Sequence, residues 1–284
     1  MISVWQAPSA GAPLECGQRP APEPAADELV LEVMHCGLCH SDLSMIGNHW
    51  VVSRYPLVPG HEVIGRVTAV GEGVDPGLIG DVRGLGWISG SCNHCSLCLG
   101  GDQNLCTSLE ATIVGRQGGF ASHVVGIGGL GHIALQFARA WGCEVTAITT
   151  NLAKAEQARR FGAHHVEELE MLPDLQSRFD LVINTVNHPL DWSAVMASLR
   201  PRGRLHQLGA VLEPIQVGAF DLIPARRSIT GSPTSSPASL QKMVEFCVRH
   251  NIRPLVEHLP MDQVNVAIQR LAKGDVRYRF VLDA

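Results

Sequence analysis

Four cysteines lie close together between residues 92 and 106 of this chain. Their spacing is Cys-x2-Cys-x2-Cys-x7-Cys, and the positions are Cys92, Cys95, Cys98 and Cys106. Four thiolates from one loop can enclose a Zn²⁺ ion tetrahedrally, and this closed shell leaves no coordination position for a substrate. We therefore predict a structural zinc ion. Disulfides are the alternative, but residues 1–18 show no basic start followed by an apolar run, so no secretory leader is predicted and reduced thiols are favoured.

A second set of possible metal ligands lies upstream of this loop. Cys39 is followed by His40, Ser41 and Asp42, and His61 is followed by Glu62. A cysteine and a histidine can hold a catalytic zinc ion whose fourth coordination position stays open. Each residue alone is more often part of a hydrophobic core, so the prediction depends on their occurring together.

A glycine-rich motif marks a candidate nucleotide site. Its residues are Gly126, Ile127, Gly128, Gly129, Leu130 and Gly131. An apolar run precedes the motif and a helical pattern follows it, as at the first turn of a dinucleotide-binding βαβ unit. There the first glycine allows a tight turn, the second lets the backbone approach a pyrophosphate, and the third lets the helix pack against the strand. The alternative is a glycine turn that binds no ligand.

The choice between NAD and NADP is read at the end of the second predicted strand. NAD sites place a carboxylate there, which holds the ribose hydroxyls. Here the strand ends at Thr149, Thr150 and Asn151, Lys154 follows, and the first carboxylate is Glu156. Hydroxyl groups and a lysine accept a 2′-phosphate better than a carboxylate does. NADP(H) is therefore the predicted cofactor.

The elements that must position these residues differ between two parts of the chain. Residues 1 to about 122 contain short β-branched runs separated by Gly and Pro turns, at 28–33, 63–70 and 81–86, which predicts a β-rich domain. From about residue 123 strands and helices alternate, which predicts a parallel sheet covered on both faces. The expected strands are 124–127, 144–148, 180–183 and 204–208, and the expected helices are 130–141 and 152–161. From about residue 253 a helix at 261–273 and a strand at 278–282 are expected to return to the first domain.

The bulk composition excludes several classes of function. The chain has 284 residues, 45% of them hydrophobic and 17% charged, which is typical of a globular protein with two domains. Its formal net charge is −5 and it has no dense block of Lys and Arg, so nucleic acid is not an expected partner. No apolar run is long enough to span a membrane, and the cytoplasm is the expected location.

Taken together and in this order, these segments resemble the zinc-dependent medium-chain alcohol dehydrogenases. The resemblance is carried by residues 39–42, 60–65, the four-cysteine loop and residues 126–131. Residues 184–187, 208–211 and 276–282 are similar to the branch of cinnamyl-alcohol dehydrogenases and broad-range aldehyde reductases. The resemblance implies an α/β fold with a GroES-like zinc domain (1–122 and 253–284) and a doubly wound, parallel-sheet Rossmann domain (123–252).

In that family a cysteine, a histidine and a second cysteine hold a catalytic zinc ion, and hydride passes between substrate and nicotinamide. The resemblance implies that Cys39 and His61 are two ligands, that Glu62 lies beside the metal, and that Ser41 exchanges the substrate's hydroxyl proton. Cofactor contacts are implied for His40, Thr185, Val186, Gly209, Val211 and Arg279. Trp50 and Trp87 are candidates for the substrate wall or, equally, for core aromatics.

The chain departs from the family pattern between its two parts. Residues 118–123 resemble the end of the catalytic barrel, and the glycine motif follows directly, whereas relatives have several dozen residues between them. The absent segment includes the third catalytic zinc ligand and most of the first strand of the parallel sheet. We therefore expect Glu62 to be the third protein ligand, since carboxylate is an acceptable one. We also expect apolar surface that relatives bury to face solvent.

Two functions follow from these observations. The first is a zinc- and NADP(H)-dependent oxidoreductase that interconverts aldehydes and primary alcohols, with activity impaired by loss of the third ligand. The second is a catalytically inactive protein of the same fold that binds zinc and nucleotide. A nucleic-acid-binding zinc ribbon is disfavoured by the acidic net charge. A small-molecule aldehyde or alcohol is the expected partner, and the resemblance implies a homodimer.

Overall fold

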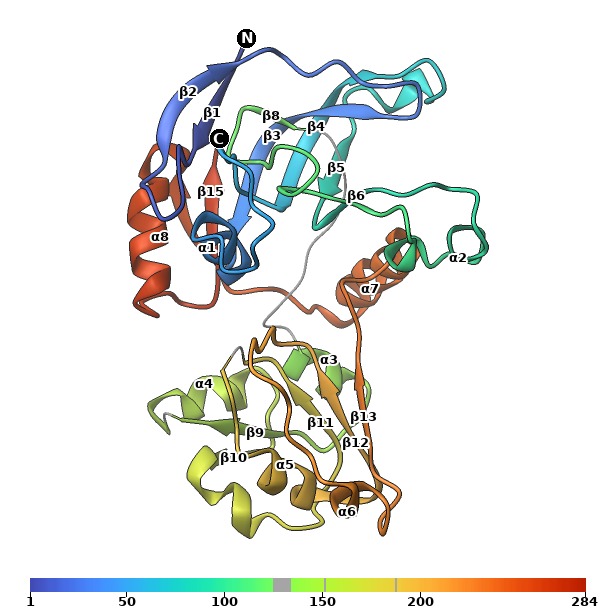
Figure 1. Ribbon diagram of the computed structural model, residues 1–284, viewed down its shortest axis with the longest axis vertical. Helices are drawn as coiled ribbons and strands as arrows, with labels where there is room; N and C mark the ends of the chain where they lie inside the picture. Colours follow the sequence, from blue (N-terminus) through green and yellow to red (C-terminus); the bar gives the residue numbers. More distant parts are fainter. Residues whose placement is uncertain (125–133, 151, 187) are drawn as a thin grey trace. The chain divides into compact units, whose positions relative to one another are not determined.

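A computed structural model describes residues 1–124, 134–150, 152–186 and 188–284 (Figure 1). Contacts divide the chain into two compact units, one of Met1–His132 with Thr234–Ala284 and one of Ile133–Pro233. The boundaries expected from the sequence were 122/123 and 252/253, so helix α7 (Pro237–His250) groups with the first unit rather than with the nucleotide-binding part. Within the described ranges no helix is long and apolar enough to cross a membrane.

The first unit is rich in β-structure. Its strands are β1 (Ile2–Gln6), β2 (Glu15–Arg19), β3 (Leu29–Leu38), β4 (Glu62–Val70), β5 (Val82–Leu85), β6 (Ile88–Gly90), β7 (Glu110–Ala111), β8 (His123–Val124), β14 (Glu257–Pro260) and β15 (Phe280–Asp283). Its helices are α1 (His40–Ile46), α2 (Ser96–Leu99), α7 and α8 (Val264–Ala272), with 3-10 turns η1 (Pro76–Leu78), η2 (Gln103–Leu105) and η5 (Met261–Gln263). The strands expected at 28–33, 63–70, 81–86 and 278–282 and the helix expected at 261–273 are all present.

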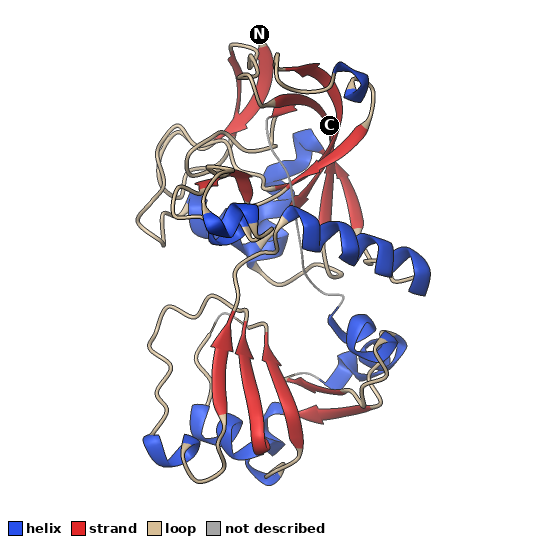
Figure 2. Ribbon diagram, turned by 90° about the vertical axis from the view of Figure 1, so that its right-hand side faces the viewer, coloured by secondary structure: helices blue, strands red, loops and turns tan. Residues whose placement is uncertain are grey.

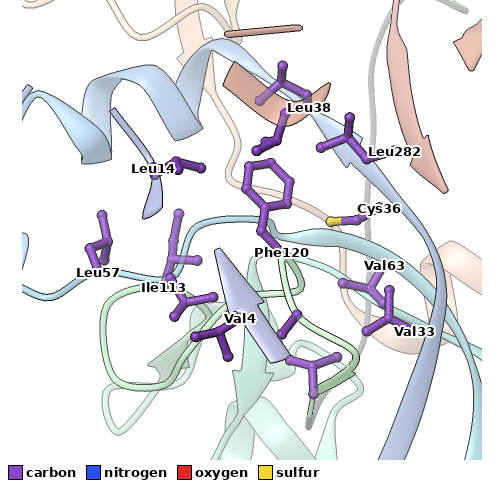
Figure 3. Close-up of a cluster of buried hydrophobic side chains, with 14 of the residues drawn as sticks. Val4, Leu14, Val33, Cys36, Leu38, Leu57, Val63, Ile113, Phe120 and Leu282 are labelled. Atoms are coloured by element: carbon purple, nitrogen blue, oxygen red, sulfur yellow. The ribbon is translucent and has the colours of Figure 1, made fainter. Parts of the chain in front are cut away.

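A six-stranded sheet forms the framework of the first unit. Its order is β14-β15-β3-β4-β5, and β8 also pairs with β3. The final strand β15 lies between β14 and β3, so the end of the chain returns to the first domain as expected. Side chains alternate along these strands: Cys36, Leu38, Phe280 and Leu282 face a core around Phe120 (Figure 3), while their neighbours face outward.

The second unit contains the predicted alternation of strands and helices. Its strands are β9 (Thr146–Thr149), β10 (His165–Glu168), β11 (Phe179–Asn184), β12 (Leu199–Gln207) and β13 (Ser228–Gly231). Its helices are α3 (Ala134–Ala140), α4 (Ala155–Arg160), α5 (Trp192–Ser198) and α6 (Ala219–Leu222), with 3-10 turns η3 (Leu152–Lys154) and η4 (Leu169–Asp174). All strand pairs in this unit are parallel.

Among the described residues of this unit, the parallel strands form two sheets. Strands β9 and β10 pair with each other, and β11, β12 and β13 form a separate sheet (Figure 2). The strand expected at 124–127 does not join them at its start, because Val124 pairs with Leu31 in the first unit. The assignment of Val124 to the parallel sheet was wrong, because this residue extends the six-stranded sheet of the first unit. Residues 125–127 lie outside the described part of the chain.

In the described part of the chain, one face of the β11-β12-β13 sheet, called the uncovered face, carries exposed apolar side chains. On the other face, Leu199 and Leu205 of β12 pack under α5 and η4 through Trp192 and Met196. On the uncovered face, Leu181 and Ile183 of the central part of β11 are 51% and 40% exposed. Strands of parallel sheets are normally buried on both faces. The exposure agrees with the expectation that a shortened chain leaves apolar surface facing solvent.

Candidate metal centres and cofactor site

The four predicted cysteine ligands gather in one loop of the first unit. One sulfur atom from each of Cys92, Cys95, Cys98 and Cys106 lies within 4.8 Å of the others, and the Sγ atoms of Cys92 and Cys98 are 3.9 Å apart. A tetrahedral zinc ion with Zn–S bonds of ~2.3 Å holds its sulfur atoms roughly 3.8 Å apart. All nine cysteines are free thiols, so the disulfide alternative is not realised. The donor set and its spacing fit a closed zinc site.

Backbone amides of the same loop prepare these sulfur atoms to carry negative charge. The amide of Cys98 donates to Cys95 Sγ at 3.5 Å, and the amides of Cys92 and Ser108 donate to Cys106 Sγ at 3.5 and 3.3 Å. Backbone hydrogen bonds from His94 and Cys95 lower the pKa of the Cys92 thiol to about 6. Thiolate is the form that binds zinc, so the loop is organised for metal before any ion enters.

The second metal centre is built where β3 ends and α1 begins. Cys39 is the N-cap residue of α1, and its amide donates to Asp42 Oδ2 at 2.9 Å. Asp42 is fully buried, and its Oδ1 accepts hydrogen bonds from the Gly60 amide at 2.9 Å and from His61 Nδ1 at 3.0 Å. One carboxylate therefore joins the helix start to the turn before β4. Gly60 fits this turn because its φ is +97° and a Cβ atom would collide with Phe120.

The hydrogen bond to Asp42 leaves the other ring nitrogen of His61 facing Glu62. The distance from His61 Nε2 to Glu62 Oε1 is 3.9 Å, and one ligand atom from each of Cys39, His61 and Glu62 lies within 4.8 Å of the others. A carboxylate that fixes the orientation of a ligating histidine is the usual outer support of a protein zinc site. The sulfur, nitrogen and oxygen donors therefore fit a zinc ion with one open position.

Arg279 lies on the other side of Glu62. Its Nη1 is 3.3 Å from Glu62 Oε1 and donates to the carbonyl of Leu38 at 3.2 Å. Burial raises the pKa of Glu62, while the positive charges of Arg279 and His61 oppose that rise. Arg279 thus supplies a permanent positive charge that can pair with the Glu62 carboxylate when this carboxylate does not bind the metal.

Two of the candidate ligands, Cys39 and His61, must each release a proton from the ligating atom before they can bind a zinc ion. Burial raises the pKa of the Cys39 thiol, but the hydrogen bond with His61 and the charges of His61 and Arg279 outweigh it, so the pKa lies below its usual value. Burial lowers the pKa of His61, but the charge and hydrogen bond of Asp42 raise it well above its usual value. Relative to free side chains, the centre therefore makes loss of the Cys39 proton easier and loss of the His61 proton harder.

Two tryptophans form a wall beside this centre. The rings of His61 and Trp87 meet edge to face with centroids 5.1 Å apart, and Trp87 meets Trp50 in the same way at 5.7 Å. Both tryptophans are partly buried and pack against the core of the unit. Ser41 Oγ lies 3.7 Å from Cys39 Sγ on the first turn of α1. The centre thus has an apolar aromatic side and a hydroxyl group within reach of the metal ligands.

The buried thiol of Cys36 does not belong to this centre. Its side chain points into the core beside Phe120 and Val63 (Figure 3). Burial, together with the nearby charge of Asp42, raises its pKa well above the usual value. Among the described residues, the cluster contains one cysteine, so the additional donor that the structure offers is the carboxylate of Glu62.

Predicted cofactor residues of the second unit lie at the carboxyl ends of its parallel strands. Thr149 ends β9 and Thr150 follows it, Thr185 and Val186 follow β11, and Gly209 and Val211 follow β12. The loops after β11 and β12 touch, because a Cβ atom on Gly209 would lie 1.8 Å from the carbonyl oxygen of Val186. Ligands of open α/β sheets bind at this edge.

A hollow of about 400 Å³ opens beside Thr150 in the second unit. Its walls include Leu169 and Leu172 of η4 and Pro189 and Leu190 before α5, and Glu168, Glu170 and Asp191 also line it.

The remaining predicted cofactor residues lie apart from this hollow or outside the described residues. The glycine motif at 126–131 and Asn151 lie outside the described residues, and His40 is the exposed first residue of α1 in the first unit. Lys154 ends η3.

Two family models together span most of the chain. Residues 25–127 match the alcohol dehydrogenase GroES-like domain, and residues 129–249 match the zinc-binding dehydrogenase domain. The Aldehyde reductase AdhA of Synechocystis sp. is 41% identical over 331 residues, with 99% of this chain and 98% of the relative covered. Cinnamyl alcohol dehydrogenase 7 of Arabidopsis thaliana is 34% identical over 312 residues, with 90% and 87% covered.

Solved structures agree with these sequence relatives. A cinnamyl alcohol dehydrogenase of Sorghum bicolor superposes with a TM-score of 0.92 at 30% identity and covers 99% of this chain and 97% of its own. The chain therefore belongs to the zinc-binding alcohol dehydrogenases, in the branch of the cinnamyl alcohol dehydrogenases and aldehyde reductases. The alignment with AdhA spans 331 residues although this chain has 284, so the relative has residues without a counterpart here.

Asp42 is the residue of the centre that reasoning from the sequence missed. It was quoted as part of the motif but given no role, although it makes three hydrogen bonds that hold the Cys39 turn and His61 together. An acidic residue three positions after an N-cap residue is a helix-start signal. That signal identifies the cap, but the contact with His61 depends on the fold.

Proposed function

We propose that this chain is a zinc- and NADP(H)-dependent oxidoreductase that interconverts aldehydes and primary alcohols. The proposal is carried by one observation: Cys39, His61 and Glu62 bring sulfur, nitrogen and oxygen donors within 4.8 Å of one another beside an aromatic wall. The names of the relatives, aldehyde reductase and cinnamyl alcohol dehydrogenase, support the substrate class. Trp50 and Trp87 offer edges and faces that suit an aromatic aldehyde.

Each residue of the Cys39 centre is proposed to have its own role in the reaction. A zinc ion, when bound, polarises the carbonyl oxygen of an aldehyde or acidifies the hydroxyl of an alcohol. Cys39, His61 and Glu62 hold that ion, and Asp42 fixes the His61 ring so that Nε2 faces it. Ser41 gives a proton to the product oxygen in reduction and takes it back in oxidation. Arg279 neutralises Glu62. Arg279 and His40 are also proposed to contact the pyrophosphate of the cofactor, His40 through a ring N–H group, because burial and the charge of Arg279 lower its pKa.

The nicotinamide cofactor is proposed to bind along the carboxyl ends of the strands of the second unit, with Thr185, Val186, Gly209 and Val211 beside it. NADP(H) is favoured because Thr149, Thr150 and Lys154 stand where an NAD site would carry a carboxylate. Glu168, Glu170 and Asp191 line the hollow next to Thr150. Calorimetric titration with both reduced cofactors tests the choice, and tighter NADH binding would overturn the NADP(H) proposal.

Turnover is proposed to be lower than in relatives that have the additional residues. In the described part of the chain, the donors near Cys39 and His61 include the carboxylate of Glu62 but no second thiolate, and the parallel strands of the second unit form two sheets. Steady-state reduction of cinnamaldehyde with NADPH tests activity and rate separately. Product alcohol formed at well below ~1 s⁻¹ supports an impaired enzyme, and a rate of ~1–10³ s⁻¹ refutes the impairment.

An inactive zinc- and nucleotide-binding protein is the second candidate, favoured by the exposed apolar face of β11. Zinc-dependent product formation that Cys39→Ser abolishes would exclude this candidate. Product absent with every aldehyde and both cofactors would support it.

We also propose a homodimer and a cytoplasmic location. In the described part of the chain β13 has one β-partner, so its other side is free for strand pairing with a second copy. Light scattering of the purified protein tests the dimer, with one chain mass as the contradicting result. Fractionation of expressing cells tests the location, with recovery from an oxidising compartment as the contradicting result.

A further inference from the structure

A third group of metal-ligand side chains lies on the outer face of the sheet in the first unit. It consists of His35 on β3, His258 on β14 and Asp283 on β15. These strands are neighbours, with β15 in the middle. The group shares no residue with the four-cysteine loop or with the Cys39 centre, and the functions discussed above make no use of it.

Strand register explains why the three side chains meet. Asp283 pairs directly with His35 across the antiparallel β15-β3 ladder, and His258 pairs with Val281 across the parallel β14-β15 ladder. Val281 and Asp283 are two residues apart, so they project from the same face of β15. All three side chains therefore lie on the face opposite to Phe280 and Leu282, which are fully buried in the core.

The distances between the three side chains are close to the distances between ligand atoms around a bound zinc ion. Asp283 Oδ1 is 2.7 Å from His35 Nδ1 and 3.0 Å from His258 Nδ1, and its Oδ2 is 3.2 Å from His258 Nδ1. Ligands at ~2.0–2.2 Å around a tetrahedral zinc ion lie roughly 3.3–3.5 Å apart, so outward shifts of about half an ångström would admit one. The two imidazole rings already stand edge to face with centroids 5.9 Å apart.

The chemistry of the three groups also suits a cation. Partial burial raises the pKa of Asp283, but hydrogen bonds from His258 and His35 outweigh this and hold it below its usual value, so the carboxylate is ionised at neutral pH. The side chains are 43%, 53% and 41% exposed for His35, His258 and Asp283, which leaves room for water to complete the coordination shell. Two imidazoles and one carboxylate favour zinc, nickel or copper over magnesium or calcium.

We propose that His35, His258 and Asp283 form a further binding site for a borderline divalent cation such as Zn²⁺. The ion joins the last strand of the chain to both of its neighbours, and it does so without touching the catalytic centre. Its occupancy stabilises the β14-β15-β3 part of the sheet, because a ligand that binds the folded state alone shifts the folding equilibrium toward it. The alternative is a triad in which Asp283 accepts two hydrogen bonds and no ion binds.

Calorimetric titration with Zn²⁺ alone tests the proposal on protein that keeps its tightly held zinc. One additional equivalent is expected for the wild type. We expect at least ~10-fold weaker binding in His258→Gln and in His35→Gln, because each removes one of three protein ligands. His250→Gln is the matched control, since His250 is an exposed histidine on α7 outside the cluster, and its titration should equal that of the wild type.

Two further measurements test whether the added zinc ion binds at His35, His258 and Asp283. Added Zn²⁺ should raise the melting temperature of the wild type and of His250→Gln but not of His258→Gln, and it should slow amide exchange of Leu282 in β15. Absence of an additional equivalent, or an additional equivalent that survives unchanged in both cluster variants, would overturn the proposal. Aldehyde reduction by His258→Gln should match the wild type, so failure here is distinct from failure of the proposed function.

Discussion

The two sulfur-containing centres of the first unit differ in how the chain builds them. The four-cysteine loop takes all its donors from residues 92–106, and amides of the same loop bond its sulfur atoms. The Cys39 centre takes its donors from two segments, and Asp42 must join them. The first centre depends on local sequence, whereas the second depends on the fold around it.

The difference matters because the relative AdhA has residues without a counterpart in this chain. The four-cysteine loop holds all its donors within residues 92–106, so a segment missing elsewhere leaves its donor set complete. For the assembled centre we propose Glu62 as the third protein ligand, on the expectation that the missing segment carries a second cysteine ligand in relatives.

The largest effect is expected from loss of the thiolate in the assembled centre. Cys39→Ser should lower kcat/KM for the best aldehyde by ~10³-fold or more, because polarisation by the metal is worth several kcal/mol. Steady-state kinetics with NADPH measure the loss. Cys16→Ser is the control, since Cys16 is exposed on β2. Equal rates for the two variants would show that Cys39 has no part in the reaction.

Loss of a thiolate from the local centre should instead affect folding. Cys98→Ser should lower the zinc affinity of the loop by more than ~100-fold and reduce the melting temperature, because a structural zinc site contributes directly to folding. Zinc release under a graded chelator, followed by differential scanning calorimetry, measures both effects. Unchanged melting with the zinc gone would mean that the loop is stable without its ion.

A smaller effect is expected from the residue that joins the two segments. Asp42→Asn should weaken zinc binding at the assembled centre by ~10–100-fold, because His61 loses the carboxylate that orients it. Asp75→Asn is the matched control, since Asp75 is an exposed capping residue of η1. Competition with a fluorescent chelator gives both affinities. A variant that binds zinc as tightly as the control would remove Asp42 from the account.

Zinc binding at the assembled centre should also depend on pH. The pKa of His61 is raised well above its usual value, so a proton competes with zinc at that residue, and the zinc affinity of the centre should rise as the pH rises. In the loop, the pKa of Cys92 is lowered to about 6, so this one thiol contributes little to the pH dependence above roughly pH 7. Zinc titrations of the assembled centre between pH 6 and pH 8 measure the slope. A zinc affinity that does not change with pH at this centre would contradict the assignment of a proton to His61.

The smallest effect is expected on the uncovered face of the second unit. Leu181→Thr should change the free energy of unfolding by about 0.5 kcal/mol or less, because the side chain is 51% exposed. Leu205→Ala on the covered face of the same sheet should cost ~2–5 kcal/mol, because Leu205 is fully buried. Denaturant unfolding compares the two. A large cost at Leu181 would mean that this face is covered in solution.

Local patterns explain which features were predictable from the sequence. The four cysteines and the strands at 63–70 and 180–183 are specified by residues next to one another, and the structure contains all of them. The family followed from motifs in a fixed order, and the comparisons bear it out.

Features that depend on tertiary pairing were missed. Val124 was assigned to the parallel sheet because its apolar run precedes the glycine motif, but it pairs with Leu31 in the six-stranded sheet of the first unit. The role of Asp42 depends on contact with a residue in another segment. His35 and Asp283 are 248 residues apart and meet through strand register, which no local pattern encodes.

Anomalous diffraction at the zinc edge, from crystals of the purified protein, tests the central claim most directly. Before any soak, the account predicts two strong peaks in the first unit, one enclosed by the four cysteines and one between Cys39, His61 and Glu62; a soak with Zn²⁺ should add a third at His35, His258 and Asp283. A peak in the four-cysteine loop with none at Cys39, even after soaking with Zn²⁺ and NADPH, would contradict it and leave a protein of dehydrogenase ancestry without the proposed chemistry.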